Sequence, residues 1–187
     1  MKFTTRDFIN VGIFTALYIA VVLLTGMIEL AGPAFMFIGI LIGILANGMV
    51  VAVYASRVPK FGALTLLALI TSILFVAFGN WWAMLILAPL LGLAADAILK
   101  ATKNFPLAYG VFSIWLVIGW LPVIFNSDEF WADVAERMNP EYADSISAVL
   151  NGPVLLIWAI GMFIVGVLGG LLGQRLSHRN FQRAGLA

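Results

Sequence analysis

The chain has 187 residues, of which 63% are hydrophobic and only 10% are charged. A water-soluble domain of this length needs a larger charged fraction, so the composition excludes a soluble protein and predicts an integral membrane protein. The absence of cysteine excludes disulfide bonds and thiolate chemistry.

Six apolar segments are long enough to cross the ~30 Å hydrocarbon core of a bilayer as α-helices. The first of them is longer than the apolar run of about 7–15 residues in a signal peptide, so we expect it to remain in the protein. Together they predict an all-α integral membrane protein with a single domain over residues 1–187. The segments are residues 8–30, 34–56, 61–79, 81–100, 105–125 and 148–174.

The charges that flank these segments indicate a direction across the membrane. Because cations concentrate in cytoplasmic loops, we predict that both termini are cytoplasmic. Nine of the ten Lys and Arg residues then lie inside, and only Arg137 lies outside. Two acidic residues, Asp7 and Asp96, lie inside with them. The seven acidic residues on the outer side are Glu29, Asp128, Glu129, Asp133, Glu136, Glu141 and Asp144.

Small residues recur at every fourth position of the first segment, at Gly12, Ala16 and Ala20, and therefore share one face of a helix. Such a stripe lets a second helix approach closely in a membrane. The second helix belongs either to another protein or to this chain, and the residues alone slightly favour this chain. Glycines at matching spacing in other segments are Gly39 and Gly43, Gly166 and Gly170, and Gly169 and Gly173.

Side chains suited to an aromatic ligand gather at the outer side, which also holds the tryptophans. Tryptophan is enriched at both membrane interfaces, so a symmetric belt does not explain why the cytoplasmic side has none. An outward-facing apolar pocket with a few polar groups does explain it. The residues are Met27, Phe35, Met36, Phe37, Asn80, Trp81, Trp82, Met84, Trp115, Trp120, Asn126, Trp131, Met138, Tyr142, Asn151 and Trp158.

Charge limits the ligand of such a pocket. Seven outer acids repel polyanions, so a neutral or cationic compound fits better than a phosphorylated one, unless Arg137 turns inward. Glu29 ends the first segment, where it serves either as an interfacial cap or as a ligand contact. Asp96, by contrast, stands four residues before Lys100 near the end of a helix, which predicts a structural ion pair at the surface.

The outer loop, residues 126–147, is the one hydrophilic stretch between the segments. Its residues Phe130, Trp131, Val134 and Met138 share a helical face, which predicts a short amphipathic helix. We expect Asn126 or Ser127 to cap this helix and Pro140 to stop it. The helix is either a connector resting on lipid headgroups or a lid over the outer pocket.

Catalytic patterns are missing from the sequence. The single histidine, His178, lies beyond the last segment without a neighbouring Cys, Asp or Glu, so no metal site is expected. The chain has no phosphate-binding loop that ends in Gly-Lys-Ser/Thr and none of the common hydrolase patterns. We therefore expect a protein that binds rather than reacts, with no cofactor of its own and no nucleic-acid partner.

Two stretches of the sequence resemble a known family. The N-terminal "RDFINVGIFTALYIAV", which contains the Ala16 and Ala20 pair, and "GLAADAILK", Gly92 to Lys100, are similar to the MptD-like, or Trep_Strep, group of S components of energy-coupling factor (ECF) transporters. This resemblance implies a bacterial plasma membrane protein that captures a micronutrient from outside. It also implies partners, namely a membrane coupling subunit (the T component) and two ATPase subunits. The alanine pair, extended by Gly12, would dock on the T component.

The resemblance further implies a substrate site near the outer surface. Haem is slightly favoured as substrate over a vitamin-like heterocycle, because the aromatic and methionine-rich mouth suits a porphyrin. Two other functions remain open, a membrane scaffold that binds no small molecule and a standalone permease. The residues that correspond to the substrate site are Glu29, Phe35, Asn80, Trp81, Trp82, Trp120, Asn126 and Asn151, joined by Met36 and Trp158 from the aromatic outer half.

Overall fold

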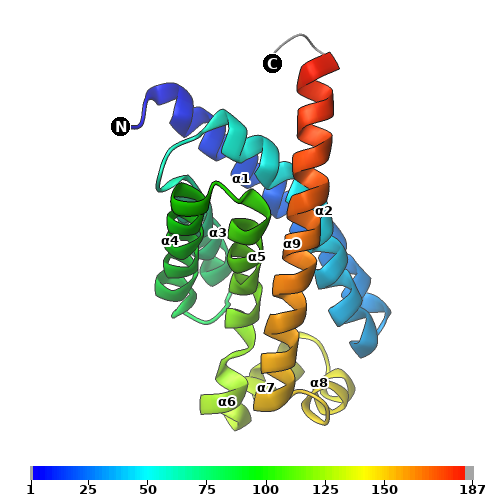
Figure 1. The fold of residues 1–187 in the computed structure, drawn as a ribbon. Coiled ribbons are helices and arrows are strands. Elements are labelled where there is room, and N and C mark those ends of the chain that lie inside the picture. The colour runs from blue at the N-terminus through cyan, green and yellow to red at the C-terminus, as the bar shows by residue number, and fades with distance from the viewer. Residues whose placement is uncertain (1, 184–187) are drawn as a thin grey trace.

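The computed structural model describes residues 2–183, and the side chains of all of these except residues 29, 30, 33, 34 and 178–183. The described chain is helical throughout and has no strand (Figure 1). Its elements are α1 (Thr5–Gly26), η1 (Met27–Ala31), α2 (Pro33–Arg57), α3 (Ala63–Ala77), α4 (Met84–Thr102), α5 (Phe105–Ser113), η2 (Ile114–Trp120), α6 (Pro122–Phe125), α7 (Ser127–Arg137), α8 (Pro140–Ser147) and α9 (Gly152–Arg183), where η marks a 3-10 helix.

Four helices in the described part are long and apolar enough to cross a membrane, namely α1, α2, α4 and α9. The predicted segments 61–79 and 105–125 correspond to shorter apolar helices, Ala63–Ala77 and Phe105–Trp120. The segment 105–125 was wrongly predicted as one continuous helix. It changes to 3-10 geometry at Ile114, and the N–H of Leu121 bonds to the carbonyl of Ile118. Pro122 has no N–H to donate to that carbonyl, so the α-helical hydrogen bond is absent at the end of this 3-10 segment.

Helix α9 lies between α2 and α5 and packs closely against both (Figure 1). A Cβ atom at Gly173 would lie 2.9 Å from the backbone nitrogen of Met49 in α2. A Cβ atom at Gly170 would lie 2.8 Å from the Cα atom of Pro106 in α5. Glycine on two neighbouring faces of α9 therefore allows two backbone-to-backbone contacts, the arrangement that small residues permit in membranes.

Buried polar side chains also join the helices. The hydroxyl of Tyr109 in α5 donates to the carbonyl of Ile44 in α2 at 2.7 Å, and Ser113 donates to the carbonyl of Met162 in α9 at 2.9 Å. Hydrogen bonds between helices stabilise packing where no water is available.

The predicted surface ion pair of Asp96 with Lys100 is wrong. Asp96 is only 3% exposed, and its carboxylate accepts hydrogen bonds from the backbone N–H groups of Leu64 and Thr65 and from the Thr65 hydroxyl, at 2.7–3.2 Å. Gly62, the N-cap residue of α3, has no side chain to cap the helix, so Asp96 of α4 supplies the cap. Lys100 instead lies over the ring of Phe61.

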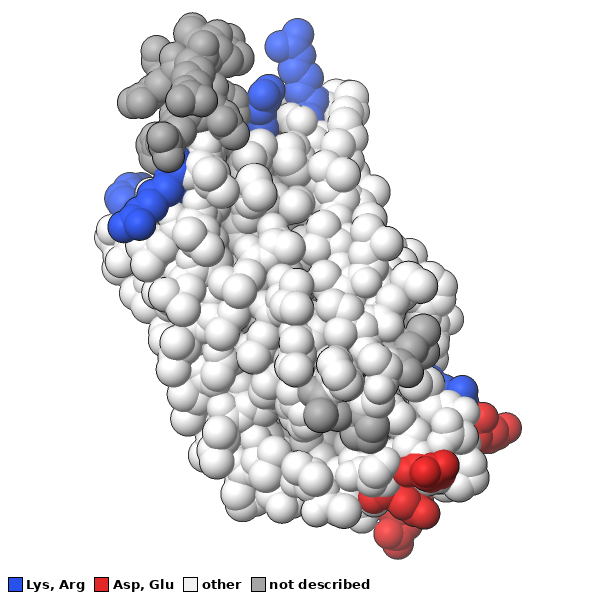
Figure 2. Space-filling view, turned by 90° about the vertical axis from the view of Figure 1, so that its right-hand side faces the viewer, with Lys and Arg blue, Asp and Glu red and all other residues white. Residues whose placement is uncertain are grey.

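Charged residues separate to the two ends of the molecule. On the face in Figure 2, most Lys and Arg atoms gather at one end and the Asp and Glu atoms at the other, where a single blue patch lies beside them. We call them the cation-rich end, which carries the first turn of α1 and the α2–α3 and α4–α5 connections, and the acid-rich end, which carries α7 and α8. Such a separation is typical of membrane proteins that follow the positive-inside rule.

The loop over residues 126–147 holds two helices rather than the one predicted. Helix α7 ends before Pro140, as expected, but Asn126 does not cap it, because its side-chain amide donates to the Glu129 carboxylate. The second helix, α8, is capped by Asn139, whose side chain accepts from the N–H of Tyr142 at 2.7 Å. Pro140 therefore ends one helix and begins the next, the first-turn position that proline tolerates best.

Candidate functional site

A cavity of about 810 Å³ opens at the acid-rich end, between the α3–α4 turn, η2 and α7. We call it the aromatic cavity, because seven of its 21 lining residues carry an aromatic ring. The aromatic lining residues are Phe75, Trp81, Trp82, Trp115, Trp120, Phe130 and Tyr142, and the polar ones are Asn80, Asn126, Glu129, Asp133 and Arg137.

The α3–α4 turn brings one wall into place. Gly79 has a φ of +90°, a conformation that favours glycine, and its N–H bonds to the carbonyl of Val76. Asn80 follows, and both its backbone N–H and its side-chain amide donate to the carbonyl of Phe75 at 3.0 Å. The Asn80 Oδ1 atom faces Gly119: a Cβ atom added to Gly119 would lie 3.4 Å from this oxygen. The turn therefore presents a hydrogen-bond acceptor inside an aromatic wall.

The deep wall is anchored to α1. Trp115 is fully buried, and its indole N–H donates to the hydroxyl of Tyr18 at 2.8 Å. The edge of Phe75 meets the Trp115 ring with their centroids 5.2 Å apart. Since a buried indole N–H needs an acceptor, Tyr18 holds the orientation of the Trp115 ring.

Helix α7 forms another wall of the cavity. Arg137 donates to the carbonyl of Gly79 at 2.8 Å and pairs with Asp133 through two contacts of 2.7 and 2.9 Å. Phe130 on the same helix meets Trp120 of η2, with ring centroids 6.0 Å apart. Asp133 thus pairs with the one cation of the cavity lining, and Glu129, which accepts from the Asn126 side-chain amide, is the other carboxylate there.

The chemistry of this lining is that of a binding site. In the part of the chain with described side chains, no group of three or more His, Cys, Asp and Glu residues is placed to hold a metal ion. The aromatic cavity offers ring faces for stacking and side-chain oxygens for hydrogen bonds.

A family comparison identifies the chain as an integral membrane protein. Residues 5–183 match the model of the family described as "Hypothetical bacterial integral membrane protein (Trep_Strep)". The chain belongs to the Trep_Strep family. Comparison with curated proteins and with solved structures gives no match.

The aromatic cavity of this Trep_Strep protein contains half of the ten predicted substrate residues. Asn80, Trp81, Trp82, Trp120 and Asn126 all line it, although they come from three separate parts of the chain. Trp81 and Trp120 are half-buried, whereas Trp82 is 63% exposed. Three of these residues lie in the α3–α4 turn, Trp120 ends η2, and Asn126 follows α6. These places meet at the acid-rich end.

The other predicted substrate residues do not line the cavity. Met36 is buried in the core, and Phe35 is 44% exposed at the start of α2. Asn151 accepts from the N–H of Val154 and so caps α9, while Trp158 packs edge-on against Phe37 at 4.7 Å. All four belong to the first two turns of α2 and α9 or to the residue before α9, and none is in the cavity lining. The side chain of Glu29 is outside those described.

Several lining residues carried no decisive sequence signal. Phe75 and Gly119 are ordinary residues of apolar helices. For Trp115, the sequence does not distinguish a cavity-lining tryptophan from one that lies at a membrane interface. The sequence marked Arg137 as the single outer cation and left open whether it turns inward, because its contact with Gly79 depends on how α7 is placed.

The small-residue stripe of α1 faces away from the rest of the chain. Gly12, Ala16 and Ala20 are all exposed, and a Cβ atom at Gly12 would meet no atom within 4 Å. Internal packing of this stripe, slightly favoured from the residues alone, is therefore wrong. The glycines considered as partners contact other helices: Gly39 and Gly43 contact Thr25, Gly166 and Gly170 contact α5, and Gly169 and Gly173 contact α2.

Proposed function

We propose that this Trep_Strep protein is the substrate-binding S component of an ECF-type importer. The observation that carries the proposal is the aromatic cavity at the acid-rich end. Its volume of about 810 Å³ falls within the range of roughly 300–1,000 Å³ that is typical of small-molecule sites. In the proposed topology α3 and Phe105–Trp120 also cross the bilayer, both termini are cytoplasmic, and the cavity opens outside the plasma membrane.

The proposed ligand is a planar ring compound that is neutral or cationic. Trp81 and Trp120 would stack on its faces, and Asn80 and Glu129 would accept hydrogen bonds from it. Haem and a vitamin-like heterocycle are the two candidates. Because Arg137 is already paired with Asp133, the rim has no spare cation for the propionates of haem. The charges that line the aromatic cavity therefore favour the heterocycle over haem as the proposed ligand.

The proposed partners are a membrane T component and two ATPase subunits, which would supply the energy for import. Their docking surface on this chain would be the exposed stripe of Gly12, Ala16 and Ala20. A helix of the T component could approach α1 closely there, because no side chain larger than a methyl group projects from the stripe.

Replacing Trp120 by alanine is expected to weaken ligand binding by about tenfold or more, since buried aromatic anchors dominate binding energy. Trp158→Ala, at a tryptophan outside the cavity, should leave binding unchanged. The measurement is native mass spectrometry of the purified protein to find a copurified ligand, followed by titration with haem, riboflavin and thiamine. Absence of any ligand, or equal losses in the two variants, would contradict the proposed site.

Replacing both Ala16 and Ala20 by leucine is expected to abolish copurification with the T component and the ATPase subunits while ligand binding persists. The two isobutyl groups would fill the stripe and keep the partner helix at a distance. Ala94→Leu, at an exposed alanine of α4, is the matched control. Assembly that survives in the double variant would rule out the stripe as docking surface.

A further inference from the structure

A second cavity, of about 410 Å³, lies at the cation-rich end. It is formed by the end of α2, the α2–α3 connection, the end of α4 and one face of α9. Its walls are apolar and buried, as at Ala52, Val58 and Phe105, whereas its lysines Lys100 and Lys103 are exposed. We call it the lysine cavity.

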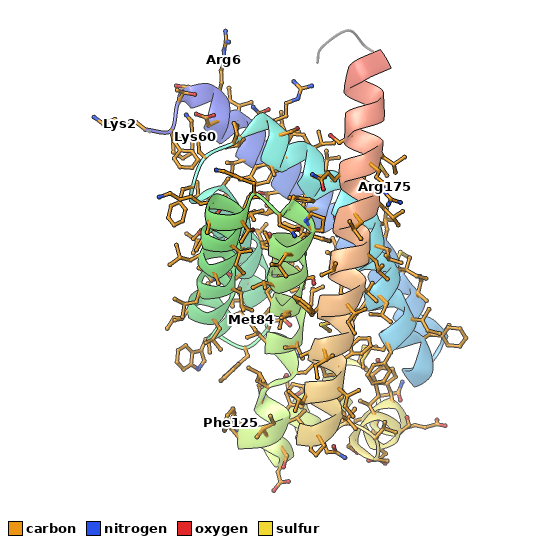
Figure 3. All side chains as sticks on the ribbon, viewed as in Figure 1. Lys2, Arg6, Lys60, Met84, Phe125 and Arg175 are labelled. Carbon is orange, nitrogen blue, oxygen red and sulfur yellow. The ribbon has the colours of Figure 1, made fainter. Side chains whose placement is uncertain are left out.

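Two of its charged groups already have partners. Lys60 pairs with Asp7 at 2.5 Å and donates to the carbonyl of Lys2 at 2.8 Å. Figure 3 shows Lys60 near the first turn of α1, with the side chains of Lys2 and Arg6 extending away from the helices. Asp96, the carboxylate of this cavity, is occupied by its hydrogen bonds to the start of α3.

Lys100 and Lys103 remain without a carboxylate among the described side chains. The Lys100 ammonium lies 5.3 Å from the centre of the Phe61 ring, and neither lysine forms an ion pair with a described acid. Two ammonium groups therefore stand beside an apolar cavity with their charge available to an anion.

The backbone of Lys103 adopts a left-handed conformation. Its φ is +57°, and within the described chain it is the only residue other than glycine with a positive φ. Glycine would end α4 here without the strain of about 1 kcal/mol that a side chain meets in this conformation. A cation at a helix C-terminus offsets part of that strain, and Lys103 also lines the lysine cavity.

We propose that the lysine cavity binds an anionic phospholipid. The phosphate would lie between Lys100 and Lys103, and part of an acyl chain would follow the apolar walls. The cavity lies where α2 and α4 end and α3 begins, which is the headgroup level for helices of a membrane protein. Basic pockets between transmembrane helices bind acidic headgroups in this way. The inference is independent of which ligand the aromatic cavity captures.

The test is a lipid titration of the full chain in detergent, read by native mass spectrometry. Phosphatidylglycerol is expected to bind more tightly than phosphatidylcholine of the same chain length. Lys103→Gly and Lys100→Gln should each weaken phosphatidylglycerol binding about fivefold, because a lysine near a membrane surface contributes about 1 kcal/mol. Arg6→Gln, at an exposed arginine of the same end outside the cavity, should change it little.

Lys103→Gly also separates binding from folding. Removal of the backbone strain should keep or raise the melting temperature, so weaker lipid binding in this variant cannot come from unfolding. Equal binding of the two lipids, or equal losses in Lys103→Gly and Arg6→Gln, would overturn the proposal. Displacement of the lipid by inorganic phosphate at equal concentration would also overturn it, since the acyl chain would then contribute nothing.

Discussion

Gly48→Ala is expected to be among the most destabilising single substitutions in this protein. The added methyl group would lie 2.8 Å from the Cα atom of Gly169, and still closer to the carbonyl group of that residue. Both groups belong to the helix backbone, so no side chain can rotate away. Overpacking at a tight contact lowers the free energy of unfolding by about 1–3 kcal/mol, and more where the backbone must move. Thermal unfolding of the detergent-purified protein measures the loss.

Gly161→Ala is the matched control on α9. A Cβ atom there would meet nothing within 4 Å. Because alanine is a better helix former than glycine, this variant should gain about 0.5–1 kcal/mol of stability. The two substitutions are chemically identical, so opposite signs would follow only from the close approach of α2 and α9. Equal shifts of the melting temperature would show that this approach does not exist.

Asp96→Ala is expected to lower the free energy of unfolding by about 2–4 kcal/mol, because it leaves several buried donors without an acceptor. Those donors are the N–H groups of Leu64 and Thr65 and the Thr65 hydroxyl. Asp96→Asn retains one acceptor oxygen and should fall between alanine and the native residue. Unfolding temperatures of the three proteins, measured in one detergent, test this order.

Two further variants distinguish the helix cap from a surface ion pair. Lys100→Gln should hardly change the unfolding temperature, since Lys100 pairs with a ring rather than with Asp96. Asp144→Ala removes an exposed carboxylate and should also have little effect. If Lys100→Gln were as destabilising as Asp96→Ala, the two residues would form the pair that their spacing suggested, and the cap would be wrong.

Hydropathy and charge along the sequence were sufficient for the class of the protein and for much of its helix pattern. Apolar runs located α1, α2, α4 and α9, because a membrane-spanning helix requires a continuous stretch of apolar residues in the sequence. Pro140 and Gly79 marked real boundaries, since proline and glycine restrict or permit backbone angles by themselves. Local sequence did not reveal the break within 105–125, where an apolar run conceals the change to 3-10 geometry.

The tertiary structure alone decided which outer residues meet. Trp120 and Trp158 were both predicted at the outer side, yet only Trp120 lines the aromatic cavity, whereas Trp158 packs against Phe37 of α2. It likewise decided that Asp96 turns inward to α3. The glycines of α9 and the stripe of α1 have the same spacing, but α9 packs inside and the stripe faces outward. Spacing assigns residues to one face of a helix, whereas the rotation of that helix against its neighbours determines what the face contacts.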